Sequence, residues 1–430
     1  MAKNSTLDLY QLDNGLRVVL VPMQGVQSVA VGVFVKTGSR YETAKDNGIS
    51  HFVEHMVFKA TKKLPTAKDT SRLEGLGAIQ NAWTDVGATA YWCKIPADKW
   101  RDGLEVVKEL ALYPLFPQKD LDIERGVILE EMKRREDRPD ELVQELLMKV
   151  MYGANPLGLA TLGDPEVIKG ITRNDFVDYH RRQYVPGRMV VVLAGRLEKI
   201  SEIKSQIAAW FGSLPAKDGE EFPHIDDTQA KPALQVLPKK LANQAHLCLS
   251  FRGFNASDPR RFASTILTTH LGQGLSSRFF LELREKRGLC YAVRADEDRL
   301  EDVGIWNVYI GTGMSTLKEA IEATLKELTR AKNKSLTKAE LGQAKQKVRG
   351  PVLFTMENPI YQMEFYARQV LDRPQEVLDY DTLLDRVMGV TVQEVQESAQ
   401  TLFQTEKINL AVVGPVDKAQ EKQLLKLLQV

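Results

Sequence analysis

Two histidines and one glutamate within residues 51–55 have the types and the spacing of a metal site. His51 and His55 are four residues apart, so on a helix they lie one above the other on the same face, which Glu54 shares. Imidazole nitrogens suit zinc, and a carboxylate beside a zinc-bound water can act as a general base. The pattern therefore predicts a metal ion held by His51 and His55, with Glu54 as the base.

The alternative for this segment is an exposed helical turn with two solvated histidines. The chain has only six histidines in 430 residues, and a chance H-x-x-E-H pattern in such a chain has odds on the order of one in a hundred. The neighbouring residues are mostly apolar, which predicts a largely buried helix: Phe52, Val53, Met56, Val57 and Phe58. Buried histidine and glutamate side chains need polar partners, and a metal ion would satisfy all three.

Two further carboxylates lie on a charged amphipathic helix that we expect over residues 118–138. Glu124 and Glu131 are seven residues apart, which is close to two helical turns, so both lie near one face. The same run contains Glu130 and several basic residues, and taken alone it is typical of a solvated helix face. The spacing by itself leaves both interpretations open.

Apolar runs rich in β-branched residues predict the strands that would position these helices. The expected strands cover residues 16–22, 29–35, 88–95, 190–195, 245–251 and 408–414. Near the end of each half a strand ends in glycine and a helix follows, over residues 199–211 in one half and 418–428 in the other. We infer a tandem duplication of one α+β domain.

The predicted organisation is two homologous domains joined by a proline-containing, charged linker. The expected bounds are 1–215 for the zinc-binding domain, 216–235 for the linker and 236–430 for the duplicated domain. Each domain is expected to be a mostly antiparallel sheet with helices packed on one face. Near the place of the metal motif, the second copy has only Thr268, Thr269 and His270, and a single histidine there predicts no second metal site.

Composition places the chain among ordinary globular proteins and offers no signal for nucleic acid or an anionic membrane. The net charge is +1, with 43% hydrophobic and 27% charged residues. Three scattered cysteines without CxxC spacing predict a reducing compartment, which we take to be the cytoplasm. Residues 1–9 are polar, so we expect no secretory signal there. The sequence contains no run of about 18 apolar residues, so we expect no transmembrane helix.

The segment 48–61 closely resembles the active-site segment of the pitrilysin-type zinc metallopeptidases, also called inverzincins. The resemblance is strongest to the mitochondrial-processing-peptidase-like group with bacterial members, and it covers essentially the whole chain. The other matching segments are 12–17, 81–84 with Tyr91, 124–132, 184–189, 275–280 and 283–291. The resemblance implies one zinc ion per chain.

This resemblance assigns roles to the carboxylates that spacing left open. It implies that His51 and His55 are zinc ligands, that Glu54 is the general base and that Glu131 is the third ligand, 131 − 55 = 76 residues after His55. Glu130 should point about 100° away around the helix. Glu124 matches an outer glutamate that orients a ligand histidine.

The resemblance also implies residues that act on the substrate. Arg284 and Tyr291, seven residues apart, match an arginine–tyrosine pair whose donors can hold the substrate carbonyl as it becomes an oxyanion. Asn81 and Ala82 match an edge-strand segment that receives the substrate backbone by β-augmentation. Taken alone, Arg284 could be one charge at a helix end, Tyr291 a core residue, and Asn81 with Ala82 an ordinary strand end.

The function we expect is that of a zinc endopeptidase acting on unfolded or flexible peptides inside a closed chamber. The zinc motif and the Arg284–Tyr291 pair are both intact in one chain, which resembles bacterial homodimers in which one subunit completes the site of the other. Two alternatives remain: a non-catalytic core or assembly subunit of the same fold, and the catalytic subunit of a heterodimer.

Overall fold

The computed structural model describes residues 7–225, 228–239 and 244–430, in two compact units. The first unit is Met1–Lys133, Leu159–Pro223 and Phe354–Asp379, and the second is Arg134–Gly158, His224–Leu353 and Tyr380–Val430. The main passage between them, after Pro223, falls inside the predicted linker. Each half of the sequence also contributes one segment to the unit formed mainly by the other half.

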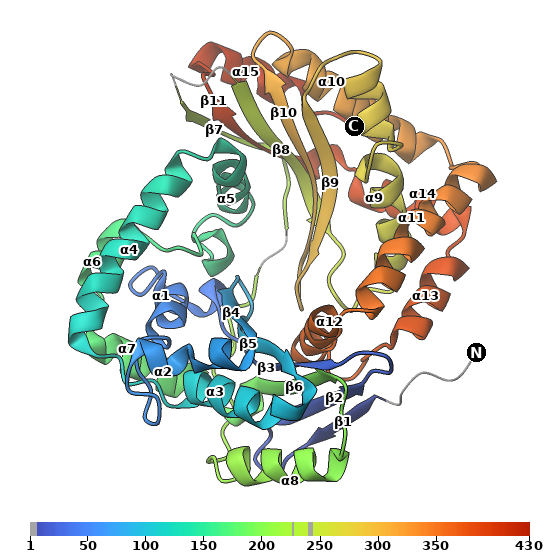
Figure 1. Cartoon of the computed structure of the whole chain (residues 1–430). Helices are drawn as coiled ribbons and strands as arrows, with labels where there is room; N and C mark the ends of the chain where they lie inside the picture. Colours follow the sequence, from blue (N-terminus) through green and yellow to red (C-terminus); the bar gives the residue numbers. More distant parts are fainter. Residues whose placement is uncertain (1–6, 226–227, 240–243) are drawn as a thin grey trace. The chain divides into compact units, whose positions relative to one another are not determined.

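The first unit is built on a six-stranded sheet with the order β1-β2-β6-β3-β5-β4 (Figure 1). Only β2 and β6 are parallel neighbours, and the other neighbouring pairs are antiparallel. The strands are β1 (Asp8–Gln11), β2 (Arg17–Pro22), β3 (Ser28–Val35), β4 (Ile79–Thr84), β5 (Thr89–Pro96) and β6 (Met189–Gly195).

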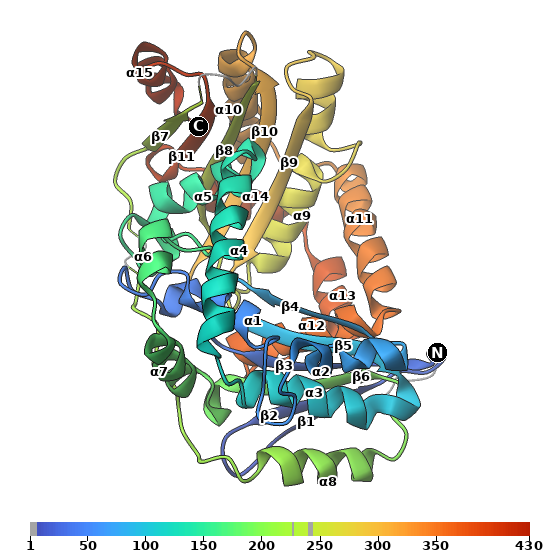
Figure 2. The same ribbon diagram turned by 60° about the vertical axis from the view of Figure 1, so that its left-hand side comes forward.

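Helices cover both faces of this sheet, because its central strands are apolar on both sides. Successive residues of a strand face opposite ways. Helix α3 (Trp100–Leu112) packs on the face of Val31, where Gly103 permits close contact with the strands. Helix α12 (Pro359–Asp372) packs on the other face, where a Cβ on Gly32 would lie 2.7 Å from Met363 Sδ. Figures 1 and 2 show α12 on one side of this sheet and α8 (Ile200–Phe211) on the other.

The predicted arrangement had helices on one face, and the second face is covered by α12, which comes from the other half of the sequence. The remaining helices of the first unit include the two that carry the metal motif and its distant carboxylates. They are α1 (Ile49–Met56), α2 (Ala67–Thr70), α4 (Gln118–Glu136), α6 (Pro165–Gly170), α7 (Arg173–Gln183) and α8 (Ile200–Phe211). The last three residues of α4 belong to the second unit.

The second unit has a five-stranded sheet with the order β7-β11-β8-β10-β9. Its strands are β7 (Ala233–Pro238), β8 (Gln244–Gly253), β9 (Ala292–Arg299), β10 (Gly304–Gly313) and β11 (Asn409–Gly414). Its helices are α5 (Pro139–Tyr152), α9 (Arg261–Gly272), α10 (Leu317–Asn333), α11 (Lys338–Met356), α13 (Tyr380–Gly389), α14 (Val392–Leu402) and α15 (Lys418–Leu427). Helix α5, from the first half of the sequence, packs on β7, β8 and β11.

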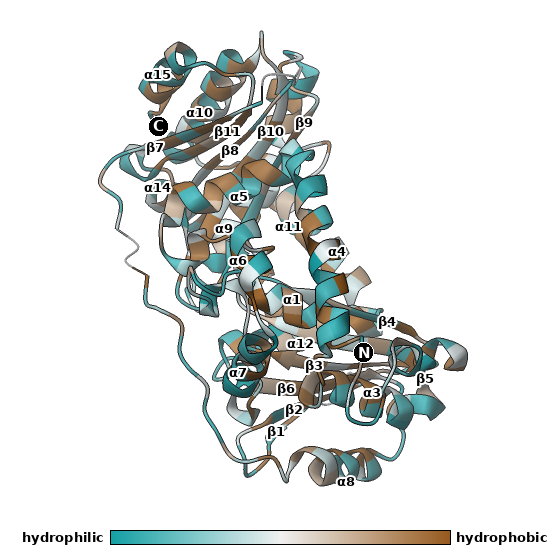
Figure 3. Ribbon diagram, turned by 90° about the vertical axis from the view of Figure 1, so that its left-hand side faces the viewer, coloured by the Kyte–Doolittle hydropathy of each residue, from teal (hydrophilic) through white to brown (hydrophobic). Residues whose placement is uncertain are grey.

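Five strands repeat the same connectivity in the two units, which is the structural counterpart of the inferred duplication. β7 and β11 are parallel neighbours, as β2 and β6 are, and the other neighbouring pairs of the second sheet are antiparallel. The central strands of both sheets are mainly hydrophobic in Figure 3. The predicted α+β class with two mostly antiparallel sheets is confirmed. Among the described residues, no helix is both long and apolar enough to cross a membrane.

Candidate metal centre

Helix α1 carries the H-x-x-E-H motif, and its first turn is anchored to a buried carboxylate. Gly48, just before the helix, has a φ of 94°, and a Cβ there would lie 2.7 Å from Gly163 Cα. Glycine offers no side chain to cap the first N–H groups of the helix. Glu42 accepts from the backbone N–H of Gly48 at 2.7 Å and from that of Ser50 at 2.8 Å.

The anchor continues through side chains behind α1. Asn47 Nδ2 donates to Glu42 Oε2 at 2.9 Å, and the Glu42 side chain is buried. The hydroxyl oxygens of Ser50 and Tyr179 are 2.6 Å apart, and Thr37 Oγ1 lies 2.8 Å from the same Tyr179 hydroxyl. These contacts fix the start of the helix at Ile49, two residues before His51.

Sequence reasoning did not identify Glu42. The residue lies in a polar, turn-rich segment in which a single acidic side chain has no periodic signature. The available signal was its position six residues before a glycine-started helix that has no capping side chain of its own. That signal suggests an acceptor, but it does not say which nearby acidic residue supplies it.

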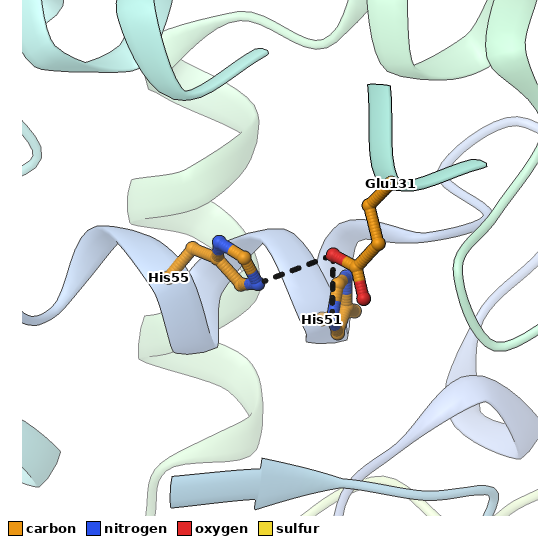
Figure 4. A group of neighbouring side chains, drawn as sticks. All are labelled: His51, His55 and Glu131. Atoms are coloured by element: carbon orange, nitrogen blue, oxygen red, sulfur yellow. Dashed lines mark ion pairs between the residues drawn. The ribbon is translucent and has the colours of Figure 1, made fainter. Parts of the chain in front are cut away.

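The structure brings His51, His55 and Glu131 together (Figure 4). Glu131 Oε2 lies 3.9 Å from His51 Nε2 and 3.8 Å from His55 Nε2. Figure 4 shows the Glu131 side chain reaching from α4 toward both imidazole rings of α1. Among the described residues, these three form the only close group of three or more histidine, cysteine or acidic side chains that could hold a metal ion.

This donor set fits zinc. Two imidazole nitrogens and one carboxylate oxygen are ordinary ligands of a catalytic zinc site, which keeps its fourth position open. Bond lengths of about 2.0–2.2 Å around a tetrahedral ion place ligand atoms roughly 3.3–3.5 Å apart. The two distances from Glu131 exceed that spacing by a few tenths of an ångström, so small side-chain adjustments would complete the shell.

Glu124 supports the cluster from the same helix as Glu131. Its Oε1 lies 2.8 Å from His55 Nδ1, and its Oε2 lies 2.5 Å from Lys59 Nζ. Burial alone would lower the pKa of His55, but the Glu124 hydrogen bond and the nearby carboxylates raise it overall. A carboxylate on Nδ1 fixes the imidazole ring and leaves Nε2 directed at Glu131, as an outer partner of a metal ligand does.

Glu54 lies on the same helix, between the two histidines in the sequence, and it is half-buried. Burial raises the pKa of its carboxyl group above the ordinary value, while a hydrogen bond from Thr84 and the charge of His55 oppose the shift. The negative charge of Glu131 adds to the increase. A raised pKa suits a carboxylate that must take up a proton near neutral pH.

Glu130 differs from its neighbour Glu131. Its side chain is 71% exposed and pairs with Lys133 Nζ at 2.6 Å, on the outer side of α4. The hundred-degree step between adjacent helical residues accounts for the difference. The solvated-face interpretation therefore holds for Glu130.

Asn81 and Ala82 lie in β4, at the edge of the first sheet. β4 pairs only with β5 among the described strands, so its other edge has no strand partner there. Asn81 is exposed, and its side-chain oxygen accepts from the Ala82 N–H at 2.9 Å. The indole of Trp83 donates to Glu364 of α12 at 3.2 Å, so the segment supplied by the other half of the sequence helps to hold this strand.

Arg284 and Tyr291 belong to the second unit. Arg284 is exposed on the short π-helix Phe280–Glu285, and its guanidinium carbon lies 5.0 Å from the Phe280 ring centroid. Tyr291 is 42% exposed just before β9, so it is not a core residue. The pairing of these two side chains with the metal cluster stays a prediction.

Comparison with known proteins places the chain in a peptidase family. Residues 17–165 match the family described as Insulinase (Peptidase family M16), and residues 170–348 match the one described as Peptidase M16 inactive domain. The uncharacterized zinc protease YmxG of Bacillus subtilis is 33% identical over 94% of this chain and 98% of its own length. An uncharacterized zinc protease of Streptomyces coelicolor is 30% identical over 96% of this chain and 90% of its own length. The chain belongs to the M16 family of peptidases.

Solved structures agree on the fold. A protease from Helicobacter pylori superposes with a TM-score of 0.87 at 22% identity, covering 95% of this chain and 99% of that one. A Pseudomonas fluorescens structure described as a peptidase M16 inactive domain also gives a TM-score of 0.87, at 20% identity over 96% of this chain and 99% of that one. The predicted resemblance to the pitrilysin-type family is confirmed.

Proposed function

We propose that this chain is a zinc endopeptidase whose reaction takes place at His51, His55 and Glu131. The observation that carries the proposal is the convergence of these three side chains, with Glu54 on the same helix as the two histidines. The relatives are named as uncharacterized zinc proteases, and these names support the same chemistry. One zinc ion per chain follows from the single donor cluster among the described residues.

The side chains divide the work in the proposed reaction. A zinc ion at this cluster would lower the pKa of a water molecule and polarise the scissile carbonyl. Glu54 takes a proton from the attacking water and delivers it to the leaving amine nitrogen. Glu124 holds the His55 ring in place through Nδ1, and Glu42 holds the start of the helix.

The proposed substrate is an unfolded or flexible peptide that adds a strand to β4. In β-augmentation, main-chain hydrogen bonds provide much of the affinity, so the segment around Asn81 and Ala82 would receive many different sequences. An edge strand without a further partner among the described strands supports this proposal. A folded protein cannot offer its backbone in this way, because its own sheets and helices already use those groups.

The proposed assembly is a homodimer that encloses a chamber and completes each site in trans. Arg284 and the hydroxyl of Tyr291 are exposed donors suited to a developing oxyanion, and one chain carries them together with the metal cluster. The cytoplasmic location inferred from the cysteines stays a prediction.

The test of the proposed function compares the wild-type chain with Glu54→Gln after loading with zinc. Cleavage of an unstructured peptide by the wild type should fall by roughly 10²–10⁴-fold in the variant, because the base is lost. Zinc content should stay the same in both. Equal cleavage by the variant would refute the role of Glu54, and a zinc-loaded wild type that cleaves nothing would favour the non-catalytic subunit.

Completion in trans has its own test. Glu54→Gln and Arg284→Ala subunits should each be nearly inactive alone, and a mixed dimer should regain one competent site. The measurement is peptide cleavage before and after subunit exchange, which native mass spectrometry can verify. Proven exchange without recovered activity would contradict completion in trans, and dependence on a different partner chain would favour the heterodimer.

A further inference from the structure

Tyr291 is the outer member of a chain of hydrogen-bonding side chains in the second unit. Its hydroxyl oxygen lies 3.2 Å from His246 Nε2, and His246 Nδ1 lies 2.8 Å from the hydroxyl oxygen of Tyr309. His246 is on β8 and Tyr309 on the neighbouring strand β10. Both inner residues are buried, whereas Tyr291 is 42% exposed.

The backbone leaves a place for the Tyr291 ring beside this chain. Gly311 of β10 is paired with His246 of β8. A Cβ on Gly311 would lie 2.4 Å from Cζ of Tyr291 and 2.5 Å from its hydroxyl oxygen. Glycine at this position therefore lets the phenol lie directly on the strand, within reach of His246.

His246 is expected to be neutral at neutral pH. Burial lowers the pKa of its imidazole, and the charge of Asp140 on α5 opposes this only in part. A neutral imidazole carries a single N–H, so one ring nitrogen donates and the other accepts. Two arrangements of the protons are then possible along the chain.

In the first arrangement, Tyr309 donates to Nδ1, and Nε2–H donates to the Tyr291 oxygen. The proton of Tyr291 is then free to point outward. In the second arrangement, Nδ1–H donates to Tyr309 and Tyr291 donates to Nε2, so the free proton belongs to the buried Tyr309. A donor without a partner costs less at an exposed hydroxyl, which water can satisfy, than at a buried one. Exposure therefore favours the first arrangement.

Burial raises the pKa of Tyr291. Burial also raises the pKa of Tyr309 well above its ordinary value, so this phenol keeps its proton. A phenol has a single O–H, and in the first arrangement Tyr309 donates it to Nδ1 of His246. The oxygen of Tyr291 then accepts from Nε2–H of His246 on its interior side.

We propose that His246 and Tyr309 are positioning residues. Their hydrogen bonds make the oxygen of Tyr291 an acceptor toward His246, so that the Tyr291 O–H is free to donate to a substrate carbonyl. This inference rests on the proposed peptidase function. It extends the predicted Arg284–Tyr291 pair inward by two residues that touch no substrate. The hydrogen bond that the Tyr291 oxygen accepts from His246 polarises the phenol and strengthens its O–H as a donor.

The tautomer of His246 is the direct test and does not depend on activity. The zinc-loaded full chain is labelled with ¹⁵N-histidine, and the His246→Gln spectrum identifies the signals of His246 among the six histidines. We expect the proton on Nε2 near neutral pH. A proton on Nδ1 would overturn the proposal, whether or not the protein is a peptidase.

Kinetics test the consequence for catalysis. We expect Tyr291→Phe to lower kcat by roughly 10²–10³-fold, as for loss of one oxyanion donor, and His246→Leu by roughly tenfold, with KM unchanged. His246→Gln should recover much of that loss, because its amide can donate in place of Nε2–H. Tyr309→Phe should lower kcat like His246→Leu, and zinc content should not change in any variant.

The outcomes separate the two levels of the hypothesis. Wild-type kcat in His246→Leu together with a deficient Tyr291→Phe would overturn the positioning role while leaving the peptidase intact. An inactive wild type would count against the proposed function, and the tautomer would still decide the hydrogen-bond arrangement. Gly311→Ala adds a check that does not alter the three side chains: it should displace the Tyr291 ring and lower kcat with normal zinc content.

Discussion

The two units repeat five strands in the same order, yet only one carries a metal cluster among the residues described. Helices α4 and α11 are each 19 residues long and make the comparison concrete. The seventh residue is Glu124 in α4 and Ala344 in α11, and the fourteenth is Glu131 in α4 and Pro351 in α11. The helix persists in the second unit, but both carboxylates are missing at these positions.

The difference shows that the repeated sheet supplies positions and that individual side chains supply chemistry. In the second unit His270 is the one histidine of α9. Burial lowers the pKa of its imidazole to about 4, so it stays neutral near neutral pH. In that unit His246 instead hydrogen-bonds to the exposed Tyr291 and the buried Tyr309. The family description of residues 170–348 as an inactive domain agrees with this division.

The sharpest way to break the comparison is to remove one histidine from each unit. His51→Ala should abolish stoichiometric zinc binding, because it leaves two protein ligands where a catalytic site needs three. His270→Ala should retain one zinc ion per chain. Metal analysis after dialysis measures the zinc content of both variants. Loss of zinc from His270→Ala alone would show that the metal site lies in the second unit.

The next largest effect should come from Glu131. Glu131→Gln replaces a charged ligand, so we expect zinc affinity to fall by more than the roughly 10–100-fold that loss of an outer partner costs. Glu130→Gln on the same helix is the matched control and should bind like the wild type, since Glu130 pairs with Lys133. Competition with a chelator measures both affinities. Equal losses would show that the wrong carboxylate was chosen.

A smaller effect is expected at Glu124, which contacts His55 rather than the metal position. Glu124→Ala should weaken zinc binding by roughly 10–100-fold, because the His55 ring loses the partner that fixes its orientation. The corresponding position in α11 is already alanine, so the change makes the first unit resemble the second there. Unaltered affinity, measured by the same chelator competition, would mean that Glu124 does not support the site.

Substitution of Glu42 should have the smallest effect on zinc binding, because Glu42 acts only by holding the start of helix α1. The quantity to measure for this residue is therefore the stability of the protein. Glu42→Gln keeps the shape of the side chain but replaces one acceptor oxygen with an amide NH2 group, so the N–H of Gly48 or of Ser50 loses its partner, which we expect to cost about 1–3 kcal/mol of stability. Glu198→Gln, at a side chain 65% exposed, should change stability by less than about 0.5 kcal/mol. Denaturant unfolding measures both, and equal stabilities would remove Glu42 from the account.

Many of the helices and strands can be predicted from short stretches of the sequence. The expected strand 29–35 is observed as β3 (Ser28–Val35), and the helix expected over 418–428 is α15 (Lys418–Leu427). Apolar periodicity and turn residues determine such elements over a few neighbours. The H-x-x-E-H motif was visible for the same reason, because its three side chains share one helical face.

Other features depend on contacts between distant residues and have no local signature. Helix α12 has an ordinary amphipathic pattern, and nothing in it says that it packs on the sheet of the other half. Glu131 could be distinguished from Glu130 only through family resemblance, because both lie in one charged run. The hydrogen bonds of Glu42 and His246 each need a specific three-dimensional neighbour, which spacing cannot reveal.

The measurement that tests the central claim most directly is X-ray absorption at the zinc edge, combined with zinc content per chain. We predict one zinc ion with nitrogen and oxygen neighbours at about 2.0–2.2 Å, two of the ligands being imidazoles. His51→Ala should remove this signal. Sulfur neighbours near 2.3 Å, which would implicate the buried cysteines, or a second ion that survives His51→Ala would contradict the claim.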